Sequence, residues 1–116
     1  MTREEFEVCI KMIRSKDSMT YEEGYSWIQE HINSYFPEIV QLMKNEQDPD
    51  LRAKFVEIIG DSMNEKSIPI LSQELKHPDY GVRCWAWNSL NTMNMRFAQE
   101  IADSYKAQNP NEDFYS

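Results

Sequence analysis

The sequence predicts an all-α protein that stacks about seven helices into a solenoid, and three observations lead to this fold class. The pattern of a helical pair is written twice between residues 36 and 93, and equivalent residues recur after 31 or 32 positions. Periods of this length are typical of stacked helical repeats. The chain also has only 3 Gly. No Asn-Gly or Asp-Gly pair joins two alternating apolar runs, so the signature of a β-hairpin is missing.

The first two expected helices lie before this repeat. Thr2 and Glu5 match a capping box, in which each side chain satisfies a free backbone amide of the other residue. A second helix is expected over about residues 18–33 and contains Gly24. Because Gly destabilises a helix by roughly 1 kcal/mol relative to Ala, Gly24 predicts a close approach of two helices. The first helix has one apolar stripe at helical spacing: Phe6, Cys9, Ile10 and Ile13.

Two helical pairs with matching spacing follow, and they carry the repeat. Pro37 and Pro69 stand in the first turn of the opening helix of each pair, where the missing amide would be unpaired in any case. A turn that contains Pro and Asp leads into the second helix, which has Arg52 or Arg83 near its start. The spacing predicts helices over about residues 37–45, 49–63, 67–77 and 82–93.

A weaker copy precedes the two pairs, and a seventh helix follows them. In that copy Gly24 aligns with a small Ala, but Tyr21 stands where the other copies carry Arg. A helix over about residues 95–106 is expected to close the stack, because terminal repeats need a cap. The last residues lack periodicity. We therefore expect a solenoid domain over residues 1–107 and a mobile acidic tail over 108–116.

The two complete copies resemble the HEAT repeat, in particular the short bacterial HEAT-like repeats. The shared features are an apolar residue before Pro in one helix, a Pro-Asp turn, and an Arg early in the next helix. The resemblance implies a right-handed solenoid with first helices on the convex face and second helices on the concave, partner-binding face. It also implies that turn aspartates and second-helix arginines link neighbouring repeats by hydrogen bonds: Asp48 or Asp50 with Arg52, and Asp79 with Arg83.

The chain is acidic, with a formal net charge of −8 and a pI near 4.7. This charge disfavours nucleic acid as a partner, because phosphate binding depends on Lys and Arg. It favours a basic protein partner, and it fits a generic solvated surface equally well. The polar amino terminus shows no signal peptide, and no apolar run reaches the length of a membrane span. We therefore expect a cytoplasmic protein without a membrane partner.

The sequence contains no constellation of catalytic or metal-binding residues. Cys9 and Cys84 lie far apart and form no CxxC motif, so neither a zinc site nor a disulfide framework is indicated. His31 and His77 have no HExxH spacing, and the few glycines form no phosphate-binding loop. We interpret both histidines as structural. We expect no enzymatic activity, no cofactor and no metal.

Comparison of the copies, column by column, predicts the locations of the three tryptophans. Trp87 and Trp27 align with mostly apolar residues and are therefore expected in the core. Trp85 aligns with Lys54 and Glu23, which are charged, so this position should face solvent on a second helix. The alternative is that the last helix covers Trp85, because Trp is usually well buried.

We therefore expect a non-catalytic protein-binding module whose acidic concave surface takes a basic protein. Its most specific form is an immunity protein or inhibitor that neutralises a basic toxin such as a nuclease, because nucleases need cationic surfaces. Two alternatives remain: a lyase or chaperone subunit for a small molecule or pigment, and an adaptor subunit of a larger assembly. The expected partner-binding residues face away from the apolar columns: Glu22, Glu23, Lys54, Glu57, Trp85, Asn88 and Asn91.

Overall fold

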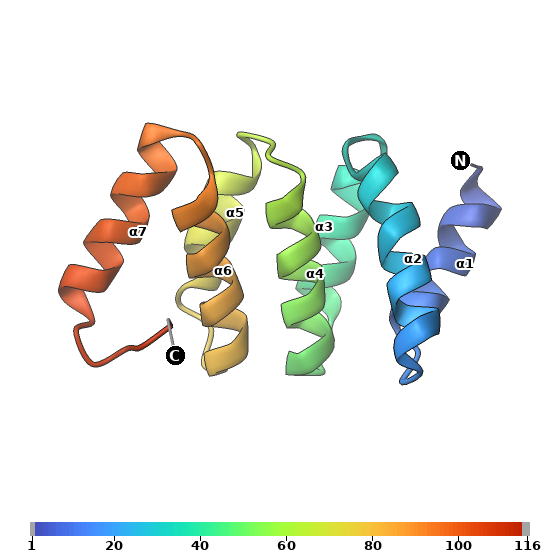
Figure 1. Cartoon of the computed structure of the whole chain (residues 1–116), viewed down its shortest axis with the longest axis horizontal. Helices are drawn as coiled ribbons and strands as arrows, with labels where there is room; N and C mark the ends of the chain where they lie inside the picture. Colours follow the sequence, from blue (N-terminus) through green and yellow to red (C-terminus); the bar gives the residue numbers. More distant parts are fainter. Residues whose placement is uncertain (1, 115–116) are drawn as a thin grey trace.

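The computed structural model describes residues 2–114, which form seven α-helices, one short 3₁₀-helix and no β-strand (Figure 1). The prediction of an all-α solenoid is confirmed. The structure is elongated, with principal extents of 43 × 26 × 23 Å. The elements in chain order are α1 (Arg3–Ile13), α2 (Ser18–His31), η1 (Ile32–Ser34), α3 (Phe36–Asn45), α4 (Pro49–Asp61), α5 (Ser67–Glu74), α6 (Tyr80–Thr92) and α7 (Arg96–Gln108).

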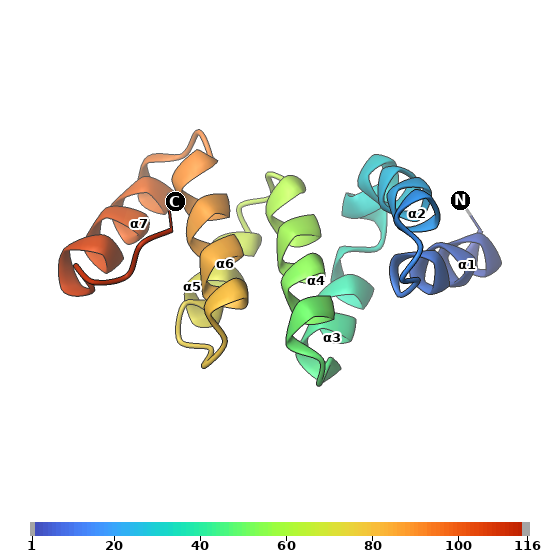
Figure 2. The same cartoon turned by 60° about the horizontal axis from the view of Figure 1, so that its bottom comes forward.

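The helices pair in chain order, and the pairs stack side by side (Figures 1 and 2). α1 packs on α2, α3 on α4 and α5 on α6, while α7 lies against α6. The first helices α1, α3 and α5 occupy one side of the stack, and the second helices α2, α4 and α6 the other (Figure 1). α4 and α6 also pack directly against each other, whereas no two first helices pack closely. We call the exposed side of α2, α4 and α6 the second-helix face.

Local capping sets the starts of these helices. At α1 the predicted capping box is confirmed, because Thr2 and Glu5 exchange two hydrogen bonds of 3.1 Å between side chains and backbone amides. Each second helix begins after an aspartate whose carboxylate accepts a hydrogen bond from a backbone amide in the first turn. Such a side chain satisfies an amide that the helix leaves unpaired. These aspartates are Asp17, Asp48 and Asp79.

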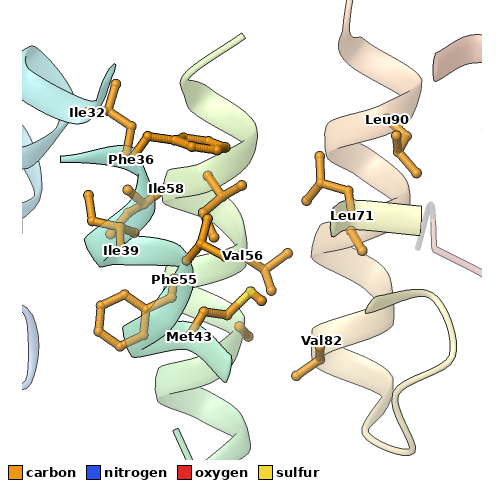
Figure 3. Packing of buried hydrophobic residues seen from close by; sticks show 14 of the residues in the cluster. Ile32, Phe36, Ile39, Met43, Phe55, Val56, Ile58, Leu71, Val82 and Leu90 are labelled. Carbon is orange, nitrogen blue, oxygen red and sulfur yellow. The ribbon is translucent and has the colours of Figure 1, made fainter. Parts of the chain in front are cut away.

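One apolar core runs through all the pairs. Figure 3 shows how side chains of α3 meet those of α4 in its central part. Ile39 on α3 and Phe55 on α4 are fully buried, and Leu71 and Leu90 continue the core into the next pair. Because each residue contacts only its own pair and the neighbouring ones, the core is a continuous band rather than a central cluster.

α4 and α6 approach closely because Gly60 faces Ser89. A Cβ added at Gly60 would lie 2.1 Å from the Oγ of Ser89 and 2.5 Å from its Cβ, which leaves no room for a side chain. Gly24 has the same role between α2 and α1, since a Cβ there would lie 2.6 Å from the Cβ of Met12. The prediction that Gly24 marks a close helix approach is confirmed.

An arginine–glutamate ion pair joins each helical pair to the structure that follows it. The partners are 22 to 32 residues apart in sequence, about one repeat. Each pair therefore connects neighbouring repeats rather than helices of one repeat. The three pairs are Arg14 with Glu46, Arg52 with Glu74, and Arg83 with Glu112.

The second-helix arginines link repeats as the family resemblance implied, but through glutamates rather than through the turn aspartates. Arg52 donates two hydrogen bonds, of 2.7 and 2.8 Å, to the carboxylate of Glu74 on α5. Asp48 and Asp79 cap their helices instead. No hydrogen bond between the side chains of a turn aspartate and the following arginine is found within residues 2–114. The implied Asp–Arg pairing is therefore corrected, and the carboxylates of Asp48 and Asp79 bind backbone amides instead.

Residues 109–114 lie against α6, whereas a mobile tail would extend away from it. Phe114 is only 8% exposed, and its ring centroid lies 5.4 Å from that of Tyr80. Glu112 accepts a hydrogen bond from the arginine of α6, which lowers the pKa of this carboxyl. The repeat pattern could not predict these contacts, because they depend on two individual side chains outside the repeats, Phe114 and Glu112. Residues 115 and 116 lie outside the described residues, and the domain boundary at residue 107 remains a prediction.

We expect Gly60→Ala to destabilise the protein by about 1–3 kcal/mol, because the new methyl group overpacks the contact with Ser89. Chemical denaturation followed by circular dichroism measures this loss. Gly81→Ala is the matched control, since its nearest neighbour, a carboxylate oxygen of Asp79, lies 3.1 Å away and leaves more room than Ser89 leaves at Gly60. Ser89→Gly should restore much of the stability of Gly60→Ala. A Gly60→Ala variant as stable as the parent would contradict a backbone-to-side-chain contact at this place.

We expect Arg52→Ala to destabilise the protein by about 3 kcal/mol, because it leaves the carboxylate of Glu74 buried without its partner. The side chain of Glu74 is only 6% exposed. Arg96→Ala is the control: Arg96 is 93% exposed in its pair with Glu100, so its loss should change stability by less than about 1 kcal/mol. Equal effects of the two substitutions in thermal denaturation would show that burial of the pair is unimportant.

Candidate partner-binding surface

The predicted partner-binding residues all come from the second helices, and they differ in exposure and in the contacts they make. Glu22 and Glu23 are exposed on α2 and point in different directions around it. Lys54 and Glu57 of α4 are half-buried and contact α2. The others lie on α6, where one is exposed and two are half-buried: Trp85, Asn88 and Asn91.

Lys54 and Glu57 belong to the junction between α2 and α4. The Nζ of Lys54 lies 4.2 Å from the ring centroid of Tyr21, a cation–π contact. The hydroxyl of Tyr25 contacts the carboxylates of both Glu57, at 3.0 Å, and Asp61. Both predicted residues are therefore engaged within the protein. The sequence pattern did not identify Tyr25 and Asp61 as part of this surface, although Asp61 follows Glu57 by one helical turn on the same face.

Tyr25 has one hydroxyl proton, and two carboxylates compete for it. Burial is the main cause that raises the pKa of Tyr25, and the hydrogen bond to Asp61 adds to it, so Tyr25 stays protonated. Burial also raises the pKa of Glu57, and the charge of Asp61 raises it further, against the lowering effects of Tyr25 and Lys54. The folded junction therefore favours the protonated form of Glu57 more than the unfolded chain does.

Trp85 is exposed, and α7 covers a different tryptophan. The exposed fraction of Trp85 is 42%, which decides between the two alternatives left by the sequence. Trp87 is 1% exposed, and its indole Nε1 donates a 2.9 Å hydrogen bond to the backbone oxygen of Ala102 on α7. The prediction that Trp87 is a core residue is confirmed. Trp85 is thus an aromatic side chain available to a partner on the second-helix face.

Asn88 and Asn91 contribute less to this face than expected. The side-chain amide of Asn88 donates hydrogen bonds to the backbone oxygen of Cys84, at 2.9 Å, and to its sulfur, at 3.3 Å. The backbone oxygen of Asn91 accepts a 2.6 Å hydrogen bond from the amide of Gln99 on α7. Both positions therefore help to hold α6 and the helix after it, and their role in partner binding remains a prediction.

The prediction that Trp27 is a core residue is wrong, because its side chain is 44% exposed. Trp27 aligns with Ile58, which is 2% exposed, and with Ser89, which packs on Gly60. On α6 this column faces the preceding second helix, because Ser89 packs against Gly60 of α4. α2 has no preceding second helix among residues 2–114, so the same column is left at the surface.

Two hollows lie on the side of the first helices. One has a volume of about 590 Å³ and lies between α5 and α7, with Leu75, Phe97 and Ile101 in its wall. A second, of about 380 Å³, separates α1 from α3 and includes Phe6 and Ile10. These partly apolar hollows thus lie away from the predicted partner-binding residues.

The histidines and cysteines of the described residues form no site of their own. The Nδ1 of His77 accepts a 3.0 Å hydrogen bond from the amide of Asp79, so it orders the turn before α6. Cys9 is buried in the core and Cys84 is half-buried. No group of three or more His, Cys, Asp or Glu side chains in residues 2–114 is arranged to hold a metal ion. In the same range, the helices are too short or too polar to cross a membrane.

A family model described as HEAT repeats matches residues 36–109, which is more than half of the chain and covers α3 to α7. The chain belongs to the HEAT-repeat family. Comparisons with curated proteins and with solved structures give no match. HEAT repeats generally mediate protein–protein interactions. The fold of this HEAT-repeat chain therefore agrees with a role in protein binding.

The pair α1–α2 lies outside the matched residues, and it differs from the later HEAT repeats in how it is linked. Tyr21 stands where the matched repeats carry the arginine of the second helix. The link to the next repeat comes instead from Arg14, at the end of α1, which pairs with Glu46. The guanidinium carbon of Arg14 also lies 5.6 Å from the ring centroid of Phe55. The same type of ion pair is thus present in the first pair, but its arginine lies at the end of α1 rather than on the second helix.

We expect Glu57→Gln to stabilise the protein at pH 7, by less than about 1 kcal/mol because solvent reaches the site. A carboxyl whose pKa is raised on folding stabilises the protein below its unfolded pKa of about 4.5 and loses this contribution as pH rises through the raised value. The advantage of the variant should therefore vanish as pH falls below 4.5. Unfolding measured between pH 4 and 8 tests this, with Glu22→Gln as a control for net charge.

Proposed function

We propose that this chain is a non-catalytic protein-binding module whose partner is a basic protein, bound on the second-helix face. In its most specific form, the partner is a basic toxin such as a nuclease, and the chain is the immunity protein or inhibitor that neutralises it. The single observation that carries the proposal is an exposed tryptophan, Trp85, on the second-helix face of a strongly acidic HEAT-repeat chain.

The charge of the chain supports a basic partner. Its net charge of −8 gives a long-range attraction for cationic proteins, which accelerates association and weakens with salt. Glu22 is exposed on the second-helix face, and Glu57 and Asp61 lie at the junction of α2 and α4. A nuclease needs a cationic surface to hold phosphates. An acidic binder of that surface would also block access of the nucleic acid.

Trp85 supports a defined contact on this face rather than a diffuse electrostatic one. Tryptophan is enriched among the residues that dominate binding energy at protein interfaces. Trp85 lies on the side of α6 that faces α4, because Ser89, one helical turn later, packs against Gly60. α4 and α6 form the tightly packed part of the stack, so Trp85 is presented from a rigid surface.

The proposal predicts salt-sensitive binding to a basic protein, which we expect to be encoded by the neighbouring gene. Affinity should fall at least tenfold when salt rises from about 50 to about 300 mM, because exposed charges are screened. Trp85→Ala should weaken binding by about 2 kcal/mol, roughly 30-fold. If the partner is a nuclease, an equimolar amount of the chain should abolish its activity. Calorimetry and a nuclease assay measure these effects.

Phe97→Ala is the matched control for Trp85→Ala. Phe97 is an aromatic side chain with 65% exposure, and it lies on α7 beside the hollow towards α5 rather than on the second-helix face. Its loss should leave the affinity unchanged. An affinity that changes neither with salt nor on Trp85→Ala would contradict binding at the second-helix face. Binding without inhibition would remove the toxin-neutralising form and leave a general adaptor.

A further inference from the structure

One edge of α2 exposes apolar side chains to solvent, although the equivalent stripe of the later second helices packs on a neighbouring helix. Met19, Glu23 and Trp27 follow one another at intervals of four residues and therefore form a stripe along α2. Met19 is 79% exposed and Trp27 44%. We call these three residues the α2 edge.

The α2 edge points away from the rest of the stack. Tyr21 and Tyr25 contact α4, and Glu23 and Trp27 follow them by two residues each. Two residues correspond to about 200° around an α-helix. The α2 edge is therefore nearly opposite the side of α2 that packs on α4, and it forms part of the end of the stack.

In the other repeats the equivalent stripe is the one that packs on the preceding second helix. Lys54, which is equivalent to Glu23, lies over the ring of Tyr21. Ser89, which is equivalent to Trp27, lies against Gly60 with no space for another atom. The α2 edge thus has the position in the repeat that receives a neighbouring helix.

The charges around the α2 edge are acidic. Glu22, Glu23 and Glu30 are exposed on α2, and this helix contains no Lys or Arg. Over residues 2–31 there are seven Asp and Glu against four Lys and Arg, and one of those four, Arg14, is paired with Glu46. An apolar stripe with carboxylates beside it is complementary to an amphipathic helix that carries Lys or Arg beside its apolar face.

We propose that the α2 edge is a second docking surface, which receives a basic amphipathic helix of the protein partner in the position of a preceding repeat. This inference rests on the proposed function, because the occupant is a part of the same basic partner. The stripe supplies apolar contact through Trp27 and Met19, and Glu23 and Glu30 pair with the basic residues of the helix. A second copy of the chain is disfavoured as the occupant, because two such acidic ends repel each other.

The test places a photo-cross-linking benzophenone amino acid at Trp27 of the full chain in its native cells. The same residue is placed at Trp85 and at Phe97 in parallel, and mass spectrometry identifies the adducts. We expect an adduct from position 27 with a protein in which Lys and Arg outnumber Asp and Glu, and none from position 97. An adduct from position 27 with an acidic protein or with a second copy of the chain would overturn the inference.

The purified partner then allows a quantitative measurement. Trp27→Ala should weaken its binding at least tenfold, and Glu23→Lys should do so at low salt. Glu65→Lys is the control for net charge, since Glu65 is exposed before α5, far along the chain from α2. Unchanged affinity in Trp27→Ala would overturn the inference. Circular dichroism confirms that each variant is folded.

The outcomes separate this inference from the function on which it rests. Cross-linking from position 85 alone, with unchanged affinity in Trp27→Ala, agrees with the proposed function and contradicts docking at the α2 edge. Loss of affinity in Trp27→Ala but not in Trp85→Ala keeps the basic partner and moves the contact from the second-helix face to the end of the stack. Absence of any adduct from both positions counts against both proposals.

Discussion

A helical pair in this protein cannot bury the side chains on its own two sides. The structure therefore depends on neighbouring pairs that cover them. α4 has α2 on one side and α6 on the other, and it contains some of the most completely buried residues, such as Phe55 and Ile59. At the C-terminal end, α7 and residues 109–114 take the place of a further pair. Glu112 supplies to Arg83 the carboxylate that Glu74 supplies to Arg52 one repeat earlier. Side coverage by a neighbour is the general condition for stability in repeat proteins.

Most of the fold was predictable because its determinants are local or periodic. The capping box at Thr2, the aspartate before α4 and the small residue at Gly24 each act within one or two helical turns, and the structure has all three. The column comparison also placed Trp87 in the core. It failed for Trp27 because a column records what the average repeat buries, whereas the first pair has one side without a neighbour. It does not extend to Phe114, because that residue belongs to no repeat.

The candidate site was less predictable, because the columns indicate the direction of a side chain but not its distance to the next helix. The columns correctly showed that Lys54 and Glu57 point away from the apolar core. They did not show that Tyr21 and Tyr25 of α2 lie close enough to engage both side chains. A residue that faces away from its own core can still face the next helix, and that spacing depends on packing between repeats. Trp85, by contrast, is exposed as its column predicted.

The two junctions between second helices differ in kind, since one is a close backbone contact and the other is a cluster of polar side chains. Between α4 and α6, the backbone of Gly60 meets Ser89 without free space, and such packing resists deformation. Between α2 and α4, polar side chains meet around Tyr25, and they rearrange by rotation about their own bonds. The edge of α2 and the surface around Trp85 lie on opposite sides of the polar junction. A protein that contacts both places must hold this junction in one arrangement, so any ordering of its side chains on binding lowers the affinity.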